Sequence, residues 1–103
     1  MLVAVDTGGT KTLVASFSED GTLGEQTKFA TPPKQADYVE KLRELITEKY
    51  SDQEVEAIII AMPGIVKEGV AVWCNNLRWK DFGVKSGMAG VLGDTPILVE
   101  NHA

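Results

Sequence analysis

The fold of this chain is decided by the stretch LVAVDTGGTKTLVASF at residues 2–17. Two short apolar runs rich in β-branched residues flank a tight polar segment, a pattern typical of a β-hairpin. Gly8 and Gly9 predict a two-residue turn with positive φ angles, which glycine adopts without steric cost. The sequence therefore predicts two antiparallel strands joined by a polar tip.

The tip of this hairpin carries groups that suit a polyphosphate. A carboxylate (Asp6), two hydroxyls (Thr7 and Thr10) and an ammonium group (Lys11) surround the two glycines. Backbone amides, hydroxyls and a lysine bind phosphate oxygens, and a nearby carboxylate suits the Mg²⁺ that accompanies them. A Gly-Gly hairpin with a solvated rim explains the same residues, so composition alone leaves both interpretations open.

The length and charge of the chain limit the classes of function that it can have. The 103 residues suffice for one domain with a single core, and 10 basic against 15 acidic residues give a formal net charge of −5. We expect no nucleic-acid partner, because neutralisation of phosphates by basic side chains drives such binding. A single cysteine, Cys74, allows no internal disulfide, and a single histidine, His102, argues against a zinc cluster within the chain.

The sequence contains no signal for a membrane or for export. No run approaches the roughly 18–20 apolar residues that a membrane span needs. The N-terminus shows neither a basic start nor an apolar core followed by a cleavage site, so we see no signal peptide. We therefore expect a cytoplasmic protein.

The first half of the chain changes from a strand period to a helical period. A third antiparallel strand is expected over residues 22–30, with Leu23 and Phe29 as its apolar anchors. Residues 34–50 have one apolar stripe at helical spacing, made of Tyr38, Val39, Leu42, Leu45, Ile46 and Tyr50. Residues 55–62 form a nearly continuous apolar run, as expected for a strand covered on both faces.

The second half predicts smaller elements. We expect a hairpin over residues 65–74 with its turn at 67–69, an irregular loop over 75–83, a short helix over 84–92 and a last strand over 97–100. The whole order predicts an α/β fold of ribonuclease-H-like layout. Its mixed sheet has three antiparallel strands followed by parallel strands, with two helices.

Four motifs resemble, in order, those of the ROK family of sugar kinases and sugar-responsive repressors. They are DTGGTK at residues 6–11, MPGIV at 62–66, NLRW at 76–79 and VENHA at 99–103. Together they span essentially the whole chain. The resemblance implies the N-terminal lobe of an actin-type or hexokinase-type ATPase.

The resemblance also implies a role for each motif. Asp6 would help to hold Mg²⁺, and the phosphates of ATP would lie against Gly8, Gly9, Thr10 and Lys11. The sugar side would be formed by Pro63, Gly64, Asn76 and Asn101, with Trp79 bordering the cleft. In the family the glycine of the Pro-Gly segment lets the sugar approach the backbone.

The chain departs from the family pattern in two respects. Where the family has an aspartate as general base, position 102 is histidine, whose larger ring lacks the two acceptor oxygens of a carboxylate. The family kinases also have a second lobe, which contributes a glutamate and a histidine to the sugar, a zinc-holding Cys/His cluster and the adenosine pocket. This chain contains none of that lobe, so we expect it to be the N-terminal half of a kinase, inactive alone.

Three functions therefore remain open. The first is half of an ATP- and Mg²⁺-dependent hexose kinase, with glucose as the default sugar and the missing C-terminal lobe as its partner. The second is a non-catalytic module that senses sugar or phosphate. The third is a homo-oligomer formed through the face that would meet the partner lobe.

Overall fold

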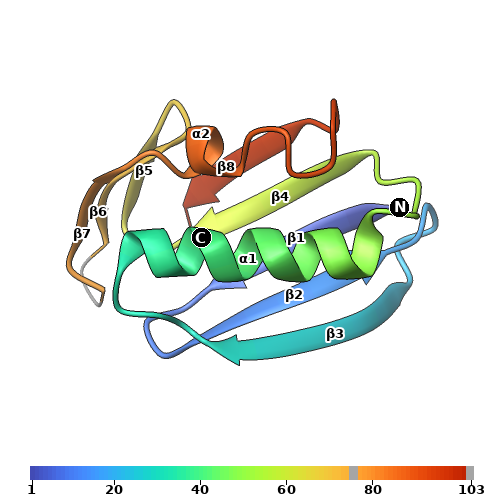
Figure 1. Ribbon diagram of the computed structural model, residues 1–103, viewed down its shortest axis with the longest axis horizontal. Coiled ribbons are helices and arrows are strands. Elements are labelled where there is room, and N and C mark those ends of the chain that lie inside the picture. The colour runs from blue at the N-terminus through green and yellow to red at the C-terminus, as the bar shows by residue number, and fades with distance from the viewer. Residues whose placement is uncertain (75–76, 102–103) are drawn as a thin grey trace.

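The computed structural model describes residues 1–74 and 77–101 of the chain (Figure 1). In chain order its elements are β1 (Leu2–Thr7), β2 (Lys11–Phe17), β3 (Leu23–Ala30), α1 (Gln35–Tyr50), β4 (Ala57–Met62), β5 (Ile65–Lys67), β6 (Val70–Cys74), β7 (Trp79–Phe82), α2 (Val84–Met88) and β8 (Ile97–Asn101). No helix in these two ranges is long and apolar enough to cross a membrane.

A five-stranded sheet in the order β3-β2-β1-β4-β8 forms the body of the molecule. β2 pairs antiparallel with both β1 and β3, whereas β4 pairs parallel with both β1 and β8. This confirms the predicted mixed α/β sheet. The carboxyl ends of β1, β4 and β8 therefore lie at one edge, beside the smaller sheet β5-β6-β7 (Figure 1).

The core lies between α1 and one face of the large sheet. The predicted apolar stripe of α1 is buried except for Val39, which is half-buried. On the sheet side, alternate residues such as Val3, Val5 and Ile60 are almost fully buried. Strand side chains alternate between faces, so a single helix can cover only half of each strand.

The opposite face of the sheet, here called the outer face, is apolar but only partly covered. It includes Ala4, Leu13, Ala15, Phe17, Leu23, Ile59 and Ala61. Two predictions fail here. β4 is not covered on both faces, because burial alternates along it. Leu23 does not anchor β3, because it lies on this face and is 47% exposed, whereas Phe29 is half-buried.

The second half of the chain is more regular than its sequence suggests. Trp79–Phe82 forms β7, which pairs with β6, so the expected loop over 75–83 is wrong for these four residues. The strand forms because Trp79 and Phe82 are both buried. The predicted helix over 84–92 is also too long. It ends at Met88, and Gly90 beyond it has a φ of 75°, which no α-helix accommodates.

The tip of the first hairpin differs from the predicted turn. Neither Gly8 nor Gly9 is among the residues with positive φ, so the expected primed turn is wrong. Gly8 instead continues the pairing of the strands, because its amide donates to the carbonyl oxygen of Lys11 at 2.9 Å. A side chain at Gly8 would place its Cβ 2.8 Å from the same oxygen. The glycine is therefore required for hairpin closure.

Candidate functional site

The parallel pairing of β1, β4 and β8 brings most of the predicted site residues to one edge of the sheet. Asp6 pairs with Ala61, and Met62 pairs with Asn101. The glycine tip after β1, the Pro63–Gly64 turn after β4 and Asn101 at the end of β8 therefore lie on neighbouring strands. Asn76 and His102 lie outside the described residues.

The hairpin tip presents a small set of donors. The carbonyl oxygens of Gly8 and Thr10 both accept hydrogen bonds from Thr31, while the amides of Gly9 and Thr10 bond to no other described residue. Thr10 and Lys11 are exposed beside them. Two amides, a hydroxyl and an ammonium group at one hairpin tip make an arrangement that suits an anion.

Thr31, in the linker between β3 and α1, fixes this tip. Its amide donates to the carbonyl oxygen of Thr10 at 2.9 Å, and its hydroxyl donates to that of Gly8 at 2.9 Å. Its hydroxyl oxygen also lies 2.8 Å from the hydroxyl oxygen of Thr12. The sequence did not predict this role of Thr31, because nothing local indicates a contact between residues 23 positions apart.

Strand register places the predicted residues on two sides of the edge. Asp6 and Lys11 alternate with residues that face α1, so both belong to the outer face. Asn101 pairs with the buried Met62 and belongs to the α1 face. The residues assigned to phosphate and metal are thus separated from the asparagine assigned to the sugar by the thickness of the sheet edge.

The Pro63–Gly64 turn is shaped by the small sheet. Gly64 has a φ of 94°, and a Cβ there would lie 2.0 Å from the carbonyl oxygen of Trp73. The close approach of β6 thus explains the glycine without any ligand. Trp79 does not border an open cleft in the described structure, because it is only 3% exposed and its ring lies 5.1 Å from that of Tyr38.

Thr7 also differs from its predicted role. Its side chain is fully buried, and its hydroxyl oxygen lies 2.5 Å from that of Tyr38 on α1. It faces away from the outer side of the hairpin, where Asp6 and Lys11 lie. The expectation of two hydroxyls at the phosphate tip is therefore wrong, and Thr10 alone of the two is exposed.

Residues 2–103 match the sequence profile of the ROK family. The chain belongs to the ROK family. No sequence among the curated proteins matches it. Among solved structures, it is similar to a ROK glucokinase from Streptomyces griseus in complex with glucose and AMPPNP, with 26% identity, a TM-score of 0.85, and coverage of 97% of this chain and 32% of that one.

Two further ROK structures extend the comparison. A hexokinase from Thermus thermophilus has 25% identity and a TM-score of 0.80, with 97% of this chain and 34% of that chain covered. A transcriptional regulator, a homologue of the Escherichia coli MLC protein, shares the fold at 17% identity, with a TM-score of 0.79 and coverage of 97% and 27%. This chain thus spans about a third of the length of its ROK relatives and has the fold of their N-terminal lobe.

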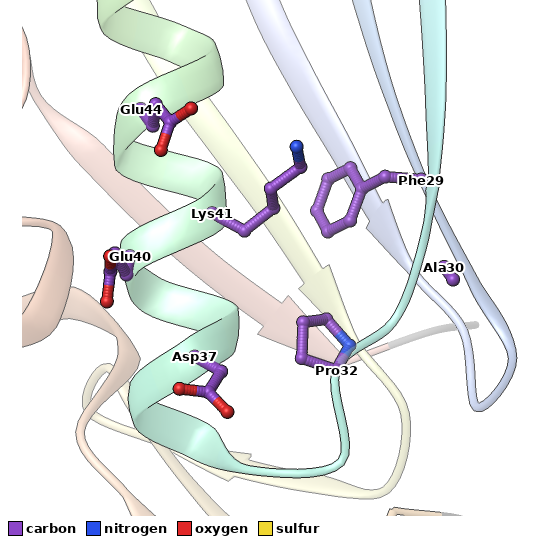
Figure 2. Close-up of a pocket in the computed structure, with 7 residues that line it drawn as sticks. All are labelled: Phe29, Ala30, Pro32, Asp37, Glu40, Lys41 and Glu44. Atoms are coloured by element: carbon purple, nitrogen blue, oxygen red, sulfur yellow. The ribbon is translucent and has the colours of Figure 1, made fainter.

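One hollow of this ROK chain lies away from the strand ends. It has a volume of about 530 Å³, lies between β3 and α1, and is lined by Phe29, Ala30, Pro32, Asp37, Glu40, Lys41 and Glu44 (Figure 2). Lys41 extends toward the ring of Phe29 (Figure 2). Three carboxylates against one lysine repel a phosphate, so this hollow does not suit the anion expected for the family.

The donors at the strand ends fit a magnesium ion that is shared with phosphates. Mg²⁺ keeps several waters and takes one or two protein carboxylates when phosphate oxygens supply the rest. Asp6 is exposed at the carboxyl end of β1, where such a ligand would be needed. No group of three or more acidic, histidine or cysteine residues forms a metal cage in the described part of this ROK chain. The carboxylate therefore fits a shared ion and not a dedicated cage.

The buried Tyr38 should make this ROK fold sensitive to alkali. Burial raises the pKa of the Tyr38 hydroxyl above its ordinary value of 10.0, because the phenolate would lose its hydration. The unfolded chain then releases the proton at a lower pH than the folded chain. The contribution of Tyr38 to the free energy of unfolding is thus fully present below pH 10 and falls as the pH rises further.

We therefore expect the Tm to fall as the pH rises from about 10 to about 12, and to fall less steeply in Tyr38→Phe. A smaller slope should remain from Tyr50, whose pKa burial also raises. Thermal denaturation followed by circular dichroism measures both slopes. Equal slopes in the wild type and the variant would show that Tyr38 does not carry the effect.

Proposed function

We propose that this chain is the N-terminal lobe of a two-lobed, ATP-dependent hexose kinase, which transfers the γ-phosphate to a sugar hydroxyl. The observation that carries the proposal is the convergence of the hairpin tip, the Pro63–Gly64 turn and Asn101 at one sheet edge. The membership of the ROK family and the likeness to a glucokinase support it. Glucose is the default sugar.

The proposal gives each group a task that its chemistry allows. The amides of Gly9 and Thr10, with the ammonium group of Lys11, would hold phosphate oxygens, while Gly8 keeps the hairpin closed. Asp6 would orient a magnesium ion through its carboxylate. When bound, Mg²⁺ would neutralise the charge that develops on the transferred phosphoryl group. We name residues 6–11 the phosphate hairpin on this basis.

The sugar would be bound on the other side of the edge. Pro63, Gly64, Asn76 and Asn101 would line that side, and His102 would stand where the family has its general base. Family kinases place ATP and sugar between two lobes, so we expect this lobe alone to show no turnover. Its apolar outer face supports this proposal, because the rest of a longer protein or a second copy would cover such a surface.

The proposal predicts that Lys11 contributes to nucleotide binding. Lys11→Gln should weaken the binding of Mg·AMPPNP by about tenfold, because it removes one charge-assisted contact to phosphate while keeping a polar side chain only one atom shorter. Titration of the 103-residue chain, followed by amide NMR shifts of Gly9 and Thr10, measures this affinity.

Lys41→Gln is the matched control, because it removes an equal charge from the acidic hollow between β3 and α1. It should leave the affinity unchanged. Equal losses in the two variants would mean that the nucleotide responds only to net charge, and a wild-type chain without any binding would refute the phosphate role of the hairpin.

A further inference from the structure

One buried hydroxyl lies against the ends of two strands that lead into the proposed site. Tyr38 on α1 is fully buried, and its hydroxyl oxygen lies 2.5 Å from that of Thr7, the last residue of β1. The same hydroxyl donates to the sulfur of Met62, the last residue of β4, at 3.9 Å. The phosphate hairpin follows the first strand, and the Pro63–Gly64 turn follows the second.

The two bonds fit one proton arrangement. If Tyr38 donates to the sulfur of Met62, its oxygen remains free to accept the proton of Thr7. Every polar hydrogen of this buried group then has an acceptor. A hydroxyl in an apolar core is tolerated only when it is bonded in this way, so both strand ends must stay in place.

The ring of Tyr38 is itself held from a third direction. It packs against Trp79 at 5.1 Å and against Phe82 at 5.9 Å between ring centroids. The indole nitrogen of Trp79 donates to the carbonyl oxygen of Pro33 at 2.8 Å. Pro33 belongs to the same linker as Thr31, which holds the hairpin tip. Contacts therefore run continuously from the hairpin tip through this linker and Trp79 to Tyr38.

We propose that Tyr38 is a positioning residue, which holds the phosphate hairpin and the Pro63–Gly64 turn at a fixed separation through its hydroxyl. The meaning of that separation rests on the proposed function, because transfer requires the phosphate and the sugar to lie in line and close together. The fixation itself is a property of the chain without any ligand.

Amide hydrogen exchange of the 103-residue chain tests the fixation. Tyr38→Phe keeps the ring and removes the hydroxyl. It should accelerate exchange at Gly8 and at Met62 by about tenfold or more, relative to the amide of Ile46 in the middle of α1. Normalising to Ile46 removes any general loss of stability from the comparison.

Tyr50→Phe is the matched control. Tyr50 lies at the other end of the same helix, is equally part of the buried stripe, and lies near Ser16 at the opposite edge of the sheet. This variant should change the relative exchange of Gly8 and Met62 less than about twofold. A uniform acceleration in Tyr38→Phe, or an equal effect of Tyr50→Phe, would overturn the proposal.

Substitutions of Thr7 separate the contact of Tyr38 with β1 from its contact with β4. Thr7→Val removes only the β1 partner, so exchange should accelerate at Gly8 and not at Met62. Thr7→Ser keeps the hydroxyl and should restore the exchange of the wild type.

Titration of the wild type with Mg·AMPPNP tests the proposed function separately. Absent binding with an intact exchange pattern would refute the phosphate role and leave the positioning by Tyr38 standing.

Discussion

Replacing Gly64 with alanine should destabilise the protein by about 2–5 kcal/mol, a large share of the stability of a domain this size. The backbone at Gly64 has a φ of 94°, which disfavours any residue with a Cβ. That Cβ would also lie 2.0 Å from the carbonyl oxygen of Trp73. Because the obstacle is backbone, no side chain can rotate away, and β6 must shift relative to the end of β4.

Gly21→Ala separates the two causes. Gly21 has a similar φ of 85°, but a Cβ there meets nothing within 4 Å. It should therefore cost only about 1–2 kcal/mol, the penalty of the left-handed backbone. Urea denaturation of both variants gives the two free energies of unfolding. Equal losses would show that the approach of Trp73 does not matter and that β6 yields easily.

Replacing His102 with aspartate should raise the rate of sugar phosphorylation by about 10²–10⁴-fold, the usual contribution of a well-placed general base. The resemblance to the ROK kinases places an aspartate at this position, one residue beyond the Asn101 that ends β8. A carboxylate offers two acceptor oxygens to the sugar hydroxyl, whereas an imidazole offers one nitrogen on a larger ring.

The measurement needs a two-lobed protein. Residues 1–103 can be joined to the part of the Streptomyces griseus glucokinase that lies beyond the covered 32% of its chain. Within this hybrid, His102→Asp is compared with His102→Asn, which cannot accept the proton and should gain nothing. Both retain the same lobe interface, so the difference between them isolates the base. Equal kcat values for the hybrid with His102 and for its His102→Asp variant would show that His102 already acts as the general base, or that another residue is the base.

The predictions for Gly64 and His102 rest on different evidence. The role of position 102 comes entirely from the sequence motif, because the residue lies outside the described part of the chain. The effect at Gly64 could not be predicted in this form. The motif suggested that the glycine admits a sugar, whereas in the folded chain the carbonyl of Trp73 lies against it.

The sequence by itself determined the order of the strands that form the large sheet and the apolar stripe of α1. Each depends on local periodicity, which can be read from neighbouring residues. Family membership likewise rests on short motifs in the right order.

Only the tertiary structure decided on which face of the sheet each site residue lies and which contacts hold the hairpin tip in place. The contact of Thr7 with Tyr38 joins residues 31 positions apart, and that of Trp79 with Pro33 joins residues 46 positions apart. The strand at Trp79–Phe82 and the burial of Thr7 both follow from such contacts. Local patterns cannot reveal them, because their stabilisation comes from partners that only the folded chain brings together.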